Sequence, residues 1–204
     1  MKKHPALAII EFRDIPAGIF ATDAMLKKAP IAFIKCGTIS RGRYLTLIGG
    51  STASVEESLT EGLVHGGDDV LDYICLADVH PRVYDAIAGI RRAAGQGALA
   101  IVETDTVASN VRAAETALKA TPVELIEIRL ADSGLSGKGI SLYQGDLHNI
   151  EAAVDVAMRF LEHAGVPVRH RIIAAPHQSL VAQITSSTWF GSQNVLELDG
   201  ENVS

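Results

Sequence analysis

The sequence predicts an α/β protein of the α+β, ferredoxin-like type, made of two tandem copies of one domain, each an antiparallel sheet with flanking helices. Three observations carry this prediction. The run ALAIIE at residues 6–11 returns as ALAIVE at residues 98–103, and the same register continues through residue 34. In each copy, apolar runs of strand length alternate with longer, Ala/Leu-rich runs of helical length. A Gly/Ser-rich loop then joins two adjacent strands at the same place in both copies.

Each copy is expected to follow the order β-α-β-β-α-β-α. The first helix ends before Pro30 or Pro122, because proline cannot continue a helix and favours the extended strand that follows. The second helix opens at an N-cap residue, Ser51 or Asp146. In copy one the expected strands are 7–12, 31–35, 44–48 and 71–76 with a first helix at 16–28; in copy two the strands are 99–102, 123–129, 140–143 and 166–173 with a first helix at 107–120.

These elements divide the chain into a first domain at residues 5–92, a second at 97–186 and a C-terminal tail at 187–204. The offset between the copies grows toward the end of each unit, which indicates short insertions in loops, where chains tolerate them. The tail has no counterpart in the first copy. It is expected to be either a swapped strand at residues 194–198 or disordered.

Several matched residues have the character of surface residues. Lys27 and Lys119 fall on the same turn of the first helix of their copies, and the Gly/Ser loops occupy the same connection. This symmetry predicts that both copies take equivalent places in a larger ring, which a duplicated chain closes with half as many subunits. Glu11 and Glu103 also match, and we interpret them as a helix cap or an inter-domain hydrogen-bond partner.

Composition excludes several classes of protein. The net charge of −6 and the pI near 5.6 argue against a nucleic-acid-binding protein, which normally carries a basic surface. No apolar stretch approaches the ~20 residues of a membrane span, so we expect no membrane association. The apolar run at residues 6–12 is too short for the core of a signal peptide, so we expect a cytoplasmic protein. Cys36 and Cys75 provide neither a disulfide framework nor a metal pattern, and the seven histidines lack metal-ligand spacing. With no nucleophile motif or paired carboxylates, we expect no catalytic residue, no metal site and no enzyme.

One alternative remains open at this point. The loop at residues 134–139, GLSGKG, could turn its amides toward an anion while Lys138 neutralises the charge. The chain would then be a small-molecule-binding regulatory protein with ferredoxin-like repeats. Phosphate loops, however, usually lead from a strand into a helix, and this loop leads from strand to strand.

The residues above resemble bacterial microcompartment shell proteins of the tandem-domain, trimer-forming class. The pattern is DAMLKKA at residues 23–29 after a strand ending in Glu11, then the Ser/Gly loop and Gly49-Gly50 before the second helix. Copy two repeats it with Glu103-Thr104, Lys119, Gly145-Asp146 and the closing residues 175–177, APH. The resemblance covers residues 6–185, and the order of elements is that of the unpermuted form.

The resemblance implies a structural protein in which three chains form a flat, pseudohexameric tile, a homotrimer of two-domain chains with a central pore for small polar metabolites. Other shell proteins are its implied partners, and the microcompartment shell is its implied location. The pore-lining residues are then Thr38, Ile39, Ser40, Arg41 and Gly42 from copy one and Ser133, Gly134, Leu135, Ser136 and Gly137 from copy two. Contacts at tile edges are expected around Lys27, Lys119, His80 and His177.

Two departures from the family pattern matter for function. In related propanediol-utilisation members, a cysteine at the place of Ser40 holds an iron–sulfur cluster at the pore. A serine hydroxyl is a poor substitute for a thiolate, so no cluster and no other cofactor is expected here. The family's closing Pro-Arg-Pro-His is also only partly kept, since Ala175 replaces the arginine in copy two and copy one reads DVHP at residues 78–81, which weakens the expected edge contacts there. The two loops differ in length as well, which predicts a threefold rather than a sixfold pore.

Overall fold

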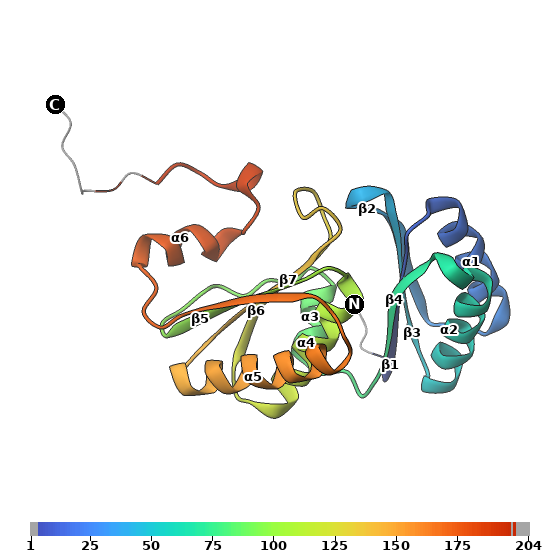
Figure 1. The fold of residues 1–204 in the computed structure, drawn as a ribbon, viewed down its shortest axis with the longest axis horizontal. Helices are drawn as coiled ribbons and strands as arrows, with labels where there is room; N and C mark the ends of the chain where they lie inside the picture. The colour runs from blue at the N-terminus through green and yellow to red at the C-terminus, as the bar shows by residue number, and fades with distance from the viewer. Residues whose placement is uncertain (1–3, 197, 199–204) are drawn as a thin grey trace.

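The computed structural model describes residues 4–196 and 198 of the chain, which form two four-stranded sheets with helices packed on them (Figure 1). Copy one contains β1 (Ala6–Phe12), α1 (Ile15–Lys28), β2 (Phe33–Ile39), β3 (Arg43–Gly50), α2 (Thr52–Gly66), β4 (Val70–Ala77) and α3 (Pro81–Ile87). Copy two contains β5 (Ala98–Thr104), α4 (Val107–Ala120), β6 (Glu124–Leu130), β7 (Gly139–Gly145), α5 (Leu147–His163), β8 (Val168–Ile173) and α6 (Gln178–Ser186).

The two sheets have the same topology. Their strand orders are β2-β3-β1-β4 and β6-β7-β5-β8, and all neighbouring strands run antiparallel. Ile9 pairs with Leu47 and Ile74, and Ile101, its counterpart, pairs with Leu142 and Arg171. The predicted fold class and element order are therefore confirmed in both copies.

The strand β2 differs from its predicted range of 31–35, because it begins at Phe33 and extends to Ile39. Pairing with β3 continues as far as Ile39 opposite Arg43, so Thr38 and Ile39 belong to the strand. The connection shrinks to the turn Ser40–Gly42, in which Arg41 and Gly42 both have φ of 69°. The corresponding connection in copy two, residues 131–138, is longer.

Alternating side chains of β1 divide the first core into two layers. Ala8, Ile10 and Phe12 face α1 and α2, which cover the outer side of the sheet (Figure 1). Leu7 and Ile9 face the opposite way, into a core shared with α3 and with α4 of the second copy. The helix α4 therefore packs between its own sheet and the sheet of copy one.

The helix α6 and the start of the tail, residues 187–192, lie on the other face of the second sheet, opposite α5 (Figure 1). There, Ile184 of α6 packs against Leu99, Ile126 and Leu142. In the described part of the tail, residues 187–196 and 198, the structure has one short 3-10 turn, Phe190–Ser192, and no strand. The predicted strand at 194–198 includes Glu197, which lies outside the described residues.

Candidate functional site

The two Gly/Ser loops, one from each copy, lie side by side and are joined through Ser40. The Ser40 amide donates to the Ala131 carbonyl oxygen at 2.9 Å, and the Ser40 hydroxyl donates to the same oxygen at 2.7 Å. The hydroxyl oxygen also accepts a hydrogen bond from the Gly137 amide at 2.8 Å. The side chain of Ser40 therefore ties the loops of the two copies together.

A buried ion pair lies beneath this contact. Nη1 of Arg43 is 2.7 Å from Oε1 of Glu11, and it also donates to the carbonyl oxygens of Asp105 and Gly137 at 2.9 Å each. The other carboxylate oxygen of Glu11 accepts from the Val107 amide, the first residue of α4, at 2.8 Å. Burial raises the pKa of Glu11, while the Val107 amide and Arg43 act in the opposite direction. The interpretation as a cap or an inter-domain partner is therefore confirmed for Glu11. It is wrong for Glu103 within the described chain, because that carboxylate pairs with Lys138 and Arg169 of its own copy.

The other predicted pore residues differ in their exposure. Thr38, Arg41, Gly42, Ser133, Gly134 and Ser136 are exposed, Ile39 and Leu135 are half-buried, and Gly137 is buried. Gly137 has φ of 84°, and a Cβ there would lie 3.0 Å from the Arg43 guanidinium carbon, so only glycine fits. The exposed residues of both loops are thus those that can face solvent or a neighbouring chain.

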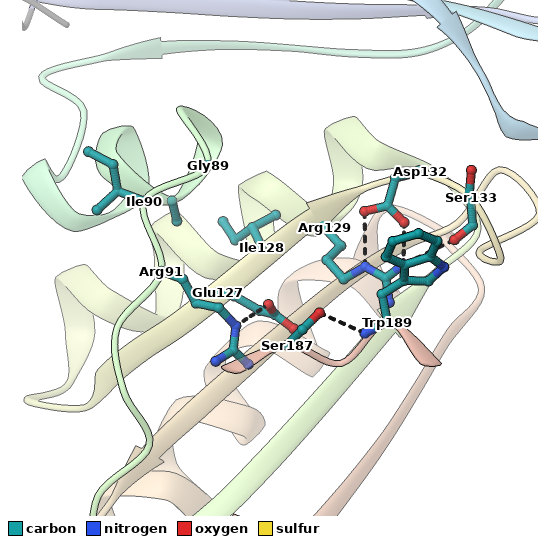
Figure 2. A pocket seen from close by; sticks show the side chains of 11 residues that line it. Gly89, Ile90, Arg91, Glu127, Ile128, Arg129, Asp132, Ser133, Ser187 and Trp189 are labelled. Atoms are coloured by element: carbon teal, nitrogen blue, oxygen red, sulfur yellow. Dashed lines mark hydrogen bonds and ion pairs between the residues drawn. The ribbon is translucent and has the colours of Figure 1, made fainter. Parts of the chain in front are cut away.

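Arg41 carries the one charge of the short loop. Within residues 4–196 and 198, no ion pair and no side-chain hydrogen bond engages its guanidinium. The charges of the longer loop, by contrast, are compensated. Figure 2 shows Asp132 and Arg129 turned toward each other beside the indole of Trp189, with Arg129 Nε 2.9 Å from Asp132 Oδ2.

Lys138 is likewise paired, since its ammonium lies 2.7 Å from Oε1 of Glu103. The Gly137 amide is already bonded to Ser40, so the loop at 134–139 offers an anion neither a free cation nor that amide. The geometry does not favour the nucleotide-binding alternative. Among the described residues, no group of three His, Cys, Asp or Glu side chains could hold a metal ion, and none of the helices is long and apolar enough to cross a membrane.

The residues predicted at tile edges lie at equivalent places in the two copies. His80 and Lys119 meet on one carboxylate, that of Glu115, which accepts the His80 amide at 3.0 Å and lies 2.8 Å from the Lys119 ammonium. On α1, the ammonium of Lys27 pairs in the same way with Asp23, which lies one helical turn before it. The imidazoles of His80 and His177 both cap the helix that follows, because their Nδ1 atoms accept the amide two residues ahead at 3.2 Å.

Sequence reasoning missed Arg82, which is buried between the copies. Its guanidinium donates to the carbonyl oxygens of Leu125, Ile126 and Ile90 at 2.7, 2.6 and 2.8 Å. Burial disfavours the charged form and lowers the pKa of this side chain, and the three hydrogen bonds to carbonyl oxygens offset part of that cost. The Arg43–Glu11 pair carried a signal in the repeat, because the matched residues Lys138 and Glu103 also have opposite charges. Arg82 carried none, since residue 179 in the second copy is serine.

Comparisons with known proteins agree with this geometry. The BMC domain model matches the chain twice, over residues 6–82 and 98–176. The bacterial microcompartment shell protein PduT of Citrobacter freundii is 34% identical over 179 residues, covering 88% of this chain and 97% of the relative.

Solved structures share the fold. A microcompartment protein from Desulfitobacterium hafniense DCB superposes with a TM-score of 0.74 at 34% identity, over 87% of this chain and 98% of that one. A double-ringed trimeric shell protein of the RMM microcompartment has the same fold at 17% identity and a TM-score of 0.56, over 77% of this chain and 82% of that one. The chain therefore belongs to the BMC-domain family of bacterial microcompartment shell proteins, in the form that carries two BMC domains in tandem.

Proposed function

We propose that three copies of this chain close into a ring of six BMC domains, which serves as a facet tile of a microcompartment shell. The observation that carries this proposal is the Ser40 contact, by which the same loop of each copy meets at one place. Repeating this relation between chains brings six such loops around one axis. Closed cyclic symmetry is the usual outcome when a chain binds its own copies head to tail and the rotation closes.

The central opening of this ring is a pore for small polar metabolites. The short turn Ser40–Gly42 alternates around it with the longer connection at 131–138, so the opening is threefold. Three Arg41 side chains, uncompensated among the described residues of each chain, would place positive charge around it. A ring of arginines favours the passage of anions, so the pore suits small anionic or polar metabolites.

The pore loops are unsuited to an iron–sulfur cluster, which requires cysteine thiolates. Ser40 stands where the thiolate would be, and its hydroxyl is already bonded to Ala131 and Gly137. Cys36 and Cys75 lie in β2 and β4, outside both loops. We propose a tile without a cofactor, structural rather than enzymatic, that contacts other shell proteins at its rim within the bacterial cytoplasm. Iron analysis and visible absorption after anaerobic purification test this, and bound iron with sulfide would contradict it.

The assembly is tested by light scattering on the full chain. A trimer has a mass of about 65 kDa, three times the 21.6 kDa of one chain. A monomer at every protein concentration would contradict the proposed tile.

The pore is tested by the ionic conductance of trimers in a planar bilayer. Arg41→Glu should shift the selectivity of the pore from anions toward cations while leaving the trimer mass unchanged. Arg159→Glu, on the exposed side of α5, is the matched control and should not alter selectivity. Unchanged selectivity in Arg41→Glu would show that the ions do not pass this loop.

A further inference from the structure

The helices α1 and α4 are equivalent in the repeat, yet only α4 is covered on both sides. Val111 of α4 is fully buried, whereas its counterpart Ile19 on α1 is 53% exposed. Leu118 is 8% exposed, and its counterpart Leu26 is 47% exposed. The difference arises because α4 packs on the sheet of copy one, while no part of the described chain covers α1 in that way.

A matching open surface lies on the second sheet. Ile101, Glu103, Val168, Arg169, His170 and Arg171 line a groove on strands β5 and β8. In the strand register, Glu11 of β1 lies opposite Asp72 of β4. At the matched place, Glu103 of β5 lies opposite Arg169 of β8. The groove therefore occupies the place on the second sheet that α4 covers on the first.

The contact of α4 with the first sheet shows what such a groove binds. The helix opens on Glu11, whose carboxylate accepts the Val107 amide. The hydroxyls of Thr106, the N-cap residue, and Ser109 both donate to Oδ2 of Asp72. A helix N-terminus is thus held by two carboxylates of the sheet, one accepting an amide and the other accepting hydroxyls.

The matched residues of the groove have different chemistry, and the difference is complementary. The counterpart of Thr106 is Asp14, the N-cap residue of α1, and the counterpart of Asp72 is Arg169. Within the chain, the hydroxyl of Thr106 donates to the carboxylate of Asp72. The matched residues provide a carboxylate, on Asp14, and a guanidinium, on Arg169. The Arg169 side chain is 78% exposed and, among the described residues, has one ion pair, from Nη1 to Oε1 of Glu103 at 3.5 Å, so its other nitrogens can meet a partner.

We propose that α1 of a second copy of this chain occupies the groove, with its Asp14 carboxylate paired to Arg169 and its Ile15 amide bonded to Glu103. Asp14 uses Oδ1 to cap its own helix through the Ala17 amide, so Oδ2 remains for the guanidinium. The Ile15 amide belongs to the first turn, where amides have no partner within the helix. Lys138 and Arg169 approach Oε1 of Glu103, and no hydrogen bond among the described residues uses Oε2.

The same charges discourage a wrong arrangement. If α1 of another chain displaced α4 from the first sheet, Asp14 would meet Asp72, and two carboxylates would repel each other. On the groove, Asp14 meets Arg169 instead. The charge pattern therefore selects the second sheet as the partner of α1, which fixes the head-to-tail order of chains. This inference rests on the proposed ring and specifies the joint between its chains.

The experiment measures the trimer–monomer equilibrium of the full chain by light scattering over a range of protein concentrations. Asp14→Asn keeps a capping oxygen but removes the charge, and it should weaken each joint about tenfold, or the three-joint association constant about a thousandfold. Arg169→Asp should weaken association further, because two carboxylates then face each other. The double variant that exchanges the charges, Asp14→Arg with Arg169→Asp, should have an association constant at least tenfold higher than that of Arg169→Asp alone.

The control is Arg159→Asp, whose parent side chain is 77% exposed and, among the described residues, forms its one ion pair with Asp155 on the same helix. It changes the net charge by the same amount as Arg169→Asp and should leave the trimer intact. Circular dichroism of each variant checks that the monomer keeps its fold. If Arg169→Asp and Asp14→Asn form trimers at wild-type concentrations, or the exchange recovers nothing, the joint is wrong and the tile stands. If the wild-type chain is monomeric throughout, the tile and the joint both fall.

Discussion

Glu11 and Glu103 are the same residue at the same strand position in two copies of one domain, and their surroundings differ. Glu11 is fully buried, pairs with Arg43 and receives the first amide of α4. Glu103 has a side chain 31% exposed and pairs with Lys138 and Arg169. The difference follows from the covalent link between the copies, because in the described chain only the first sheet is covered at this place by a helix of the other copy, α4. The duplication therefore builds one contact between domains into the monomer and leaves the matching surface on the second sheet open, where we propose that a second chain binds.

The strongest test of this comparison is Glu11→Ala against Glu103→Ala. Removing Glu11 leaves Arg43 buried without its carboxylate, and it should lower the free energy of unfolding by about 3–5 kcal/mol. Removing Glu103 from its half-exposed site should lower the stability of the isolated chain by less than about 1 kcal/mol. Urea unfolding at several protein concentrations separates this effect from assembly. Equal losses for the two variants would contradict the comparison.

A second test compares Arg82→Ala on α3 with Ser179→Ala at the matched position of α6. It measures how much the contact of α3 with the second copy stabilises the chain. Arg82→Ala removes three hydrogen bonds from a charged donor to carbonyl oxygens, two of them in the other copy, and we expect a loss of about 2–3 kcal/mol. Ser179→Ala should change the stability by no more than about 0.5 kcal/mol. Thermal unfolding followed by circular dichroism measures both. A negligible effect of Arg82→Ala would show that β6 holds its position without this contact.

The smallest expected effect concerns the two loop serines. Ser40→Ala removes the hydroxyl that joins Ala131 to Gly137, and it should cost about 1–2 kcal/mol. Ser136→Ala, at an exposed position with φ of 51°, should change the stability by no more than about 0.5 kcal/mol. Hydrogen exchange at the Gly137 amide gives a local readout, with faster exchange expected only in Ser40→Ala. Unchanged exchange there would contradict the role assigned to Ser40.

Local patterns in the sequence were sufficient for the fold. The repeated ALAI run, the prolines after each first helix and the matched Gly/Ser loops specified two domains with the same element order, because strand, helix and turn preferences act over a few residues. The repeat also indicated a cap or an inter-domain bond at the matched glutamates, and the structure shows both at Glu11 but neither at Glu103 within the described residues. The range of β2 was less predictable, since its extension to Ile39 depends on pairing with β3.

Contacts between residues far apart in the chain decided the rest. Ser40 bonds to Ala131 and Gly137, Arg82 bonds to Leu125 and Ile126, and α4 is buried where α1 is exposed. No sequence window contains both partners of such a contact, and the repeat itself suggests that α1 and α4 should be alike. The duplication of the domain was determined by the sequence alone. Only the tertiary structure decided which copy is covered within the chain, because burial depends on which surfaces meet after folding.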